Sequence, residues 1–144
     1  MSSNTDRSFI DTNILLYAHD QRDPGKQEIA QALLRKLWRD RTGVLSTQVL
    51  IEFYNTATQK LKPAMSKSEA RAIMTDYGTW CSSNTSPLQL VWASSLQERY
   101  STSWWDALII EAAMRSGAKT LLSEDMQHGQ TFGLLTVRNP FVEN

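Results

Sequence analysis

The sequence has almost no cysteine and no long apolar run. Cys81 is the only cysteine among 144 residues, which excludes an internal disulfide and a cluster of thiolate zinc ligands. Residues 1 to 7 contain no apolar signal segment, and no stretch approaches the roughly 18 apolar residues of a membrane span. We therefore expect a cytoplasmic protein with no place in a membrane.

The sequence also lacks net charge. It has 15 Lys and Arg against 15 Asp and Glu, so its composition is not that of a strongly basic nucleic-acid binder. A length of 144 residues suits one domain with one core, and no repeat, low-complexity tract or linker divides the chain. We therefore expect a single domain over residues 1–144.

Short apolar runs alternate with helical patterns along the chain. We expect strands at 8–10, 44–46, somewhere within 85–88, at 119–122 and at 134–137. We expect helices at 12–18, from 23–24 to Gly43, from Thr47 to near Pro63, from Ser66 to about Trp80, from about Gln89 to Tyr100 and from Ser103 to Gly117. Strands separated by helices indicate an α/β fold with a parallel sheet and helices on both faces.

Four carboxylates stand where their neighbours predict an apolar residue or a turn. Asp11 and Asp125 each follow a predicted strand, and in an open parallel sheet the ligand crevice lies outside these strand ends. Asp106 lies in the first turn of a predicted helix and Glu52 one to two turns into another, so both could face the same edge. Oxygen ligands of this kind suit Mg²⁺ or Mn²⁺, which promote phosphodiester hydrolysis.

Each of these acids also has an ordinary structural explanation. Asp11 could cap the segment that follows it, Asp106 could belong to a capping box, and Asp125 could stabilise a turn. Glu52 lies opposite the apolar stripe of its helix and could be a solvated surface acid. The spacing alone does not decide between these explanations and a metal site.

Four strings contain the acids: Phe9–Tyr17 (FIDTNILLY), Ser46–Tyr54 (STQVLIEFY), Trp105–Ile109 (WDALI) and Leu122–Gly129 (LSEDMQHG). In this order they resemble the motifs of the PIN-domain family, particularly the VapC-like toxin ribonucleases of bacterial toxin–antitoxin pairs. The resemblance runs from about Phe9 to Phe141. It implies a three-layer α/β/α sandwich with a mainly parallel sheet, and an endoribonuclease that depends on Mg²⁺ or Mn²⁺.

The resemblance also implies roles for particular residues. Asp11, Glu52, Asp106 and Asp125 would bind the metal, while Asn13 or Ser123 would position water or phosphate. Thr12 could share the role of Asn13, and Glu124 could be an auxiliary ligand ranked below Asp125.

The partners implied are RNA as substrate, a cognate antitoxin and a second copy of the chain. A homodimer is also expected because large apolar residues such as Tyr54, Trp80, Trp92 and Trp104 exceed what one sheet can bury. Trp105 is expected on the apolar face of its helix together with Leu108 and Ile109. Two other functions stay open: a signalling receiver domain and a catalytically silent PIN-like binding module.

Overall fold

The computed structural model describes residues 5–81 and 84–142. One sheet has the strand order β2-β1-β3-β5-β4. Its strands are β1 (Ser8–Ile10), β2 (Gly43–Val44), β3 (Thr120–Leu122), β4 (Thr131–Phe132) and β5 (Leu135–Arg138). All neighbouring strands run parallel except β4, which pairs antiparallel with β5.

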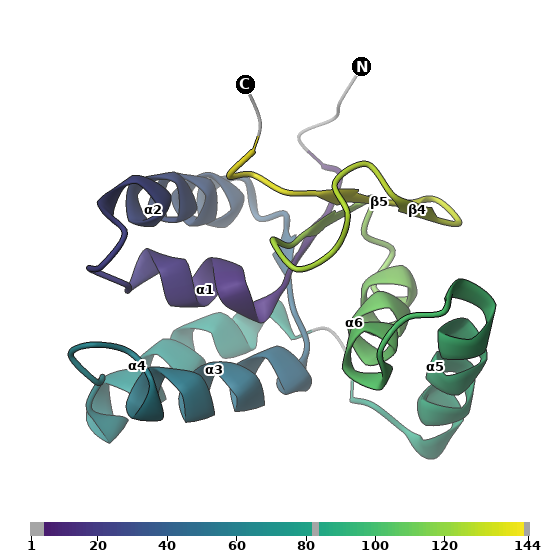
Figure 1. The fold of residues 1–144 in the computed structure, drawn as a ribbon, viewed down its shortest axis with the longest axis horizontal. Helices are drawn as coiled ribbons and strands as arrows, with labels where there is room; N and C mark the ends of the chain where they lie inside the picture. The colour runs from purple at the N-terminus through teal and green to yellow at the C-terminus, as the bar shows by residue number, and fades with distance from the viewer. Residues whose placement is uncertain (1–4, 82–83, 143–144) are drawn as a thin grey trace.

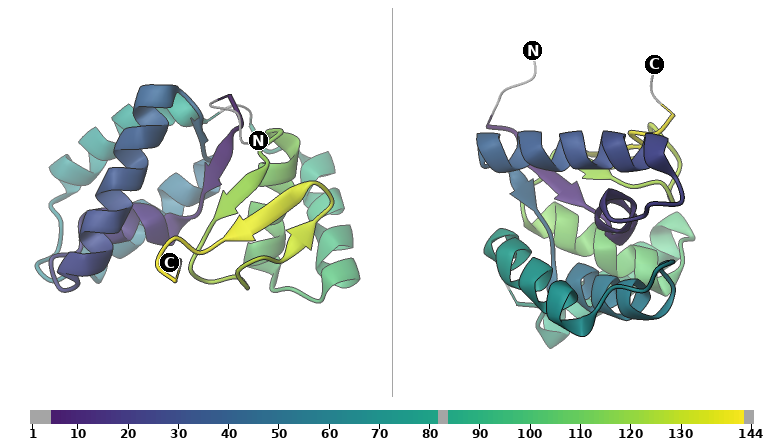
Figure 2. Two further views of the ribbon diagram at one scale, coloured as in Figure 1. Left: turned by 90° about the horizontal axis from the view of Figure 1, so that it is seen from above. Right: turned by 90° about the vertical axis from the view of Figure 1, so that its left-hand side faces the viewer.

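Helices cover both faces of this sheet. They are α1 (Thr12–Ala18), α2 (Pro24–Asp40), α3 (Thr47–Gln59), α4 (Lys67–Tyr77), α5 (Pro87–Tyr100) and α6 (Trp104–Arg115), with a 3₁₀ turn η1 (Gly78–Trp80) after α4. Figure 1 shows their arrangement, and the right view of Figure 2 shows α2 on one side of the sheet with α3, α4 and α6 on the other. The predicted three-layer α/β/α sandwich is therefore confirmed. Among the described residues, no helix combines the length and the apolar composition needed to cross a membrane.

Side-chain caps fix where the helices begin. Asp11, Asp23, Ser66 and Ser103 each accept a hydrogen bond from a backbone N–H in the first turn of the following helix. These bonds satisfy donors that have no partner within the helix. The capping residues are those that the sequence suggested, so four of the predicted helix starts agree with the structure.

One predicted strand is absent from the described residues, and one observed strand was not predicted. Residues 84–88 contain no strand, because Ser86 and Gln89 form a capping box and Pro87 begins α5. Pro at this position suits a first helical turn and cannot donate to a sheet. The short strand β4 was not predicted; Gly133, with φ of 62°, begins the tight turn that pairs it with β5.

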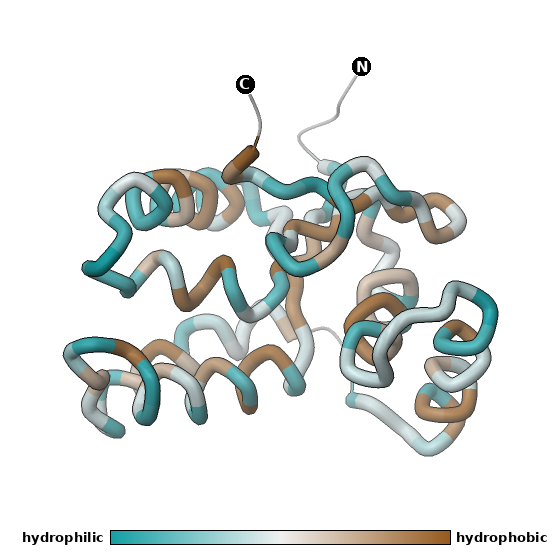
Figure 3. The backbone as a smooth tube through the Cα atoms, in the orientation of Figure 1, coloured by the Kyte–Doolittle hydropathy of each residue, from teal (hydrophilic) through white to brown (hydrophobic). Residues whose placement is uncertain are grey.

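The core lies between the sheet and the helices, and its largest buried side chains include Phe9, Phe53 and Phe132. Trp105 was expected on the apolar face of its helix but is 61% exposed at the start of α6, whereas Ile109 of the same face is buried. Helix α2 buries Ala30, Leu34 and Leu37 and leaves Ile29 exposed. Figure 3 shows the apolar stretches along the central strands and also along the peripheral helix α5.

Candidate active site at the carboxyl edge of the sheet

The ends of β1 and β3 bring two predicted site residues into direct contact. Ile10 lies opposite Leu122 in the parallel pairing, so Asp11 and Ser123 follow at the same level of the sheet. The Ser123 hydroxyl donates a hydrogen bond of 2.7 Å to Asp11 Oδ2, and the Thr12 N–H donates one of 2.8 Å to Oδ1. Both side chains are buried, so the sheet register fixes the Asp11 carboxylate in one orientation.

The Asp11 carboxylate lies in an environment that disfavours its charge. Burial raises its pKa to about 7, the two hydrogen bonds oppose this rise, and the nearby Asp125 and Glu52 carboxylates add to it. Its hydrogen bonds come from a hydroxyl, a backbone N–H and an amide, none of which carries a charge. A buried acid with neutral partners is an unusual arrangement unless a proton or a cation completes it.

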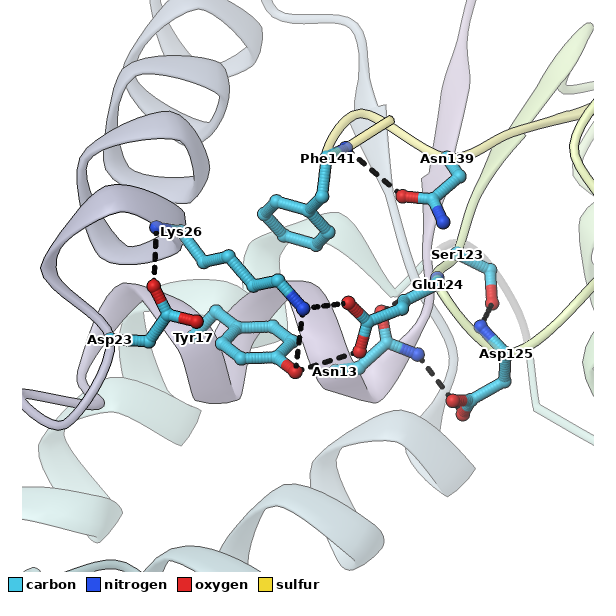
Figure 4. Close-up of polar contacts among 9 residues, drawn as sticks. All are labelled: Asn13, Tyr17, Asp23, Lys26, Ser123, Glu124, Asp125, Asn139 and Phe141. Carbon is cyan, nitrogen blue, oxygen red and sulfur yellow. Dashed lines mark hydrogen bonds and ion pairs between the residues drawn. The ribbon is translucent and has the colours of Figure 1, made fainter. Parts of the chain in front are cut away.

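Asn13 connects Asp11 with the loop after β3. Its Nδ2 donates to Asp125 Oδ2 at 3.1 Å and to Asp11 Oδ2 at 3.5 Å, while its Oδ1 accepts the Glu124 N–H at 3.1 Å (Figure 4). Asn13 therefore holds two of the predicted ligands and the backbone between them. Like Ser123, it is placed to orient carboxylates, since its polar atoms are already engaged.

Glu52 faces the same edge from α3. Its Oε2 accepts a bond of 2.8 Å from the Thr12 hydroxyl, and its Oε1 accepts one of 3.1 Å from Gln48, which also bonds the Trp105 carbonyl. Glu52 is therefore half-buried and tied to α1, and the alternative of a solvated surface acid is wrong. Gln48 was missed, although its position one turn before Glu52 is the spacing at which helical side chains meet.

Asp106 completes the set from the first turn of α6, where Ser103 caps the helix by accepting the Asp106 N–H. Burial raises the pKa of Asp106, a hydrogen bond from Ser103 lowers it, and Asp125 and Glu52 raise it further. Asp106 and Asp11 thus both experience the charges of Glu52 and Asp125. The four predicted ligands are thus linked through Glu52 and Asp125, which lie within electrostatic reach of both Asp11 and Asp106.

The chemistry of these residues fits a hard divalent cation. Within residues 5–81 and 84–142, no three His, Cys, Asp or Glu side chains are close enough to bind one ion directly. The four acids offer oxygen donors, the Asn13 amide lies between two of them, and Asp11 has no cationic partner. Mg²⁺ keeps several waters and takes only one or two carboxylates directly, so wider spacing of this kind suits it.

Glu124, the predicted auxiliary ligand, is engaged by other partners. Its carboxylate pairs with Lys26 of α2 and accepts a bond of 2.7 Å from the Tyr17 hydroxyl of α1. Figure 4 shows it directed toward these two side chains and away from Asp125. Sequence reasoning missed Lys26 and Tyr17, and no local signal could have found them because Lys26 lies 98 residues from Glu124.

A groove of about 280 Å³ opens beside the acids. Its lining includes Asn13, Asp125, Lys60 and Arg22, and it runs between α1 and the end of α3. Arg22 is paired with Asp20 at 2.9 Å. Lys60 forms no side-chain ion pair with the part of the chain that the structure describes. The groove therefore joins the acidic edge to an available positive charge.

Comparisons with known proteins agree with this architecture. A chain in the crystal structure of VapBC2 from Rickettsia felis, bound to a DNA fragment from its promoter, superposes with a TM-score of 0.61 and 17% identity. The match covers 92% of the present chain and 97% of the other. A comparison with curated proteins found no match. The family model described as "PIN domain" matches residues 8–131, and because this is most of the sequence, the chain belongs to the PIN-domain family.

Proposed function

We propose that this protein is an endoribonuclease that depends on Mg²⁺ or Mn²⁺ and hydrolyses RNA phosphodiester bonds. The observation that carries the proposal is the buried Asp11 carboxylate, with neutral hydrogen-bond donors and the Glu52 and Asp125 charges nearby. Membership of the PIN-domain family supports a nuclease and speaks against a signalling receiver domain. A catalytically silent PIN-like module remains the alternative that an assay must test.

The residues divide into ligands and positioning groups. Asp11, Glu52, Asp106 and Asp125 would hold the ion, either directly or through its bound waters. The ion would supply polarisation of a phosphoryl oxygen and a lowered pKa of a bound water. Ser123 and Thr12 fix the Asp11 carboxylate through hydrogen bonds of 2.7 and 2.8 Å. Asn13 orients Asp125, and Gln48 orients Glu52. The chain thereby holds its carboxylates in place before a substrate arrives.

The proposal includes the setting in which the nuclease acts. The similarity in fold to a chain of the VapBC2 structure supports a role as the toxin of a toxin–antitoxin pair, with a small antitoxin as partner. We propose that RNA is the substrate, that the toxin is a homodimer and that it works in the cytoplasm. An antitoxin Arg or Lys inserted among the carboxylates would inhibit the toxin by pairing with them.

The experiment is cleavage of labelled RNA by the purified chain in Mg²⁺, in Mn²⁺ and in EDTA. Asp106→Asn should lower the rate at least about 100-fold, because it removes one predicted ligand. Asp76→Asn, at an exposed acid of α4, is the matched control and should cleave at the wild-type rate. Cleavage that persists in EDTA would exclude the metal-dependent mechanism, and wild-type activity of Asp106→Asn would exclude that residue as a ligand.

A further inference from the structure

Two neighbouring acids, Glu124 and Asp125, are directed toward different partners. Figure 4 shows the Glu124 carboxylate between Lys26 and Tyr17, whereas Asp125 is directed toward Asn13. The Tyr17 hydroxyl donates to Glu124 Oε1 at 2.7 Å, and Lys26 Nζ pairs with Oε2. Both oxygens of Glu124 are thus engaged by its own chain, and one of the two partners is a cation, which would compete with a metal ion for the carboxylate.

The Lys26 ammonium is held on several sides. It lies 4.8 Å from the centre of the Tyr17 ring and 5.5 Å from that of Phe141, and these two rings meet edge to face at 5.0 Å. Aromatic faces attract a cation, and they shield it from part of the solvent. The Lys26 and Glu124 side chains are only 34% and 26% exposed, so their pairing is stronger than that of freely solvated charges. The hydrogen bond that Lys26 donates to the Glu124 carboxylate accordingly raises the pKa of Lys26.

Helix α1 holds Glu124 at two points. Tyr17 bonds its carboxylate, and Asn13, one turn earlier, accepts its backbone N–H at 3.1 Å. The same Asn13 side chain donates to Asp125 at 3.1 Å. A shift of Glu124 would therefore move the hydrogen bond on which the position of Asp125 depends.

We propose that Lys26, Tyr17 and Glu124 form a clamp that positions Asp125 and Asn13 at the acidic edge, and that Glu124 is not a metal ligand. The role of the clamp in metal binding rests on the proposed function, but the existence of the clamp does not. Lys26 also neutralises Glu124, so a fifth free carboxylate does not add to the repulsion among the other four. Lys26 and Tyr17 are thus positioning residues, since they act through Glu124 and Asn13.

The first test uses the metal-free protein and amide hydrogen exchange. In Lys26→Met and in Glu124→Gln, the amides of Glu124 and Asp125 should exchange at least about tenfold faster than in the wild type, because their hydrogen bonds open more often. Lys36→Met, at an exposed lysine of the same helix, should leave them unchanged. Unchanged exchange in both clamp variants would overturn the clamp, whether or not the protein binds metal or cleaves RNA.

The second test measures Mn²⁺ affinity by calorimetry in a double-mutant cycle. Loss of a group that orients a ligand typically weakens metal binding about tenfold or more. Lys26→Met and Glu124→Gln should each do so, and the double variant should bind no more weakly than either, because both break one pairing. Reversal of the pair in the double variant Lys26→Glu with Glu124→Lys should recover part of the affinity.

If Glu124 were a ligand, the results would differ. Glu124→Gln would then lose most of the affinity, while Lys26→Met would keep or strengthen it by freeing a carboxylate. That pattern would overturn the proposal, as would wild-type affinity in both single variants. RNA cleavage by Lys26→Met should recover as Mn²⁺ is raised at a temperature where circular dichroism shows the metal-free variant fully folded, so that the recovery cannot come from overall stability. A wild type without Mn²⁺ affinity would refute the proposed function and leave the exchange experiment to decide on the clamp.

Discussion

At the scale of single residues, Asp11 shows how an acid can be placed against its own solvation preference. The strand pairing buries it, and the Ser123 hydroxyl and the Thr12 N–H compensate only part of the lost hydration. A carboxyl group whose pKa is raised in the folded state lowers the stability of that state when it ionises. In the metal-free protein, ionised Asp11 therefore lowers the stability of the folded state, and the same carboxylate is available to bind a cation.

Asp11→Asn should stabilise the metal-free protein at high pH. The folded pKa of about 7 lies above the unfolded value of 3.8, so wild-type stability falls as pH rises between these values. The rise in pKa corresponds to about 4 kcal/mol at most, and loss of hydrogen-bond geometry should leave a gain of about 1–3 kcal/mol at about pH 8. Well below pH 3.8 the Asp11 carboxyl group is neutral in both the folded and the unfolded state, and the gain should vanish. Urea unfolding in EDTA measures this, and an equal gain at both pH values would contradict the explanation.

Much of the candidate site was predictable from the sequence, and the reason differs between residues. Asp11 and Asp125 follow predicted strands, so the rule for parallel sheets places them at one edge. Glu52 was ambiguous, because only the Thr12 contact, 40 residues away in sequence, shows that its side of α3 is not solvated. The pairing of Lys26 with Glu124 could not be predicted from the sequence, since no local pattern encodes a contact between two distant segments.

Glu52→Gln should reduce the stabilisation of the folded state by bound metal. A ligand that binds only the folded state stabilises it by mass action, by about 2.7 kcal/mol at 100 times its dissociation constant. Mn²⁺ should therefore raise the melting temperature of the wild type, and it should raise that of Glu52→Gln by less than half as much. Glu98→Gln, an exposed acid on α5, is the control. An equal rise in both site and control variants would remove Glu52 from the ligand set.

At the scale of secondary structure elements, short strands are harder to predict than capped helices. A strand was expected within 85–88, yet Ser86 and Pro87 in this segment are strong helix-start signals. Strand β4 has two residues and depends on pairing with β5, so only the turn at Gly133 signals it. Capping is local and readable, whereas strand pairing depends on the partner.

The groove between α1 and α3 gives an element-scale prediction for RNA binding. Lys60 lies beside the acidic edge and forms no ion pair with residues 5–81 or 84–142, so a backbone phosphate of the substrate could pair with it. Lys60→Gln should raise the KM for RNA about three- to tenfold with little change in kcat, and it should reduce the salt dependence of binding. Lys62→Gln, two residues further on and outside the groove lining, should have no such effect. If both variants changed the KM for RNA equally, the position of Lys60 in the groove would have no specific role in binding phosphate.

At the scale of the whole molecule, the expected excess of apolar surface is present, but mostly at other residues than the sequence suggested. Trp80 is buried and packs against Trp38 and Tyr77, so it needs no partner chain. Leu88, Val91 and Trp92 are more than half exposed and recur at helical spacing along one face of α5. Beside Trp92, a groove of about 440 Å³ lies between α5 and α6.

We predict that a second copy of the chain covers this face of α5, because exposed apolar residues grouped on one helix are typical of an interface. Trp92→Glu should shift the light-scattering mass from dimer to monomer at high micromolar concentration while leaving the helical circular dichroism unchanged. Ile29→Glu, at a partly exposed apolar residue of α2, should remain dimeric and is the matched control. A wild type that is strictly monomeric would refute the dimer, and a dimer that tolerates Trp92→Glu would place the interface on another face.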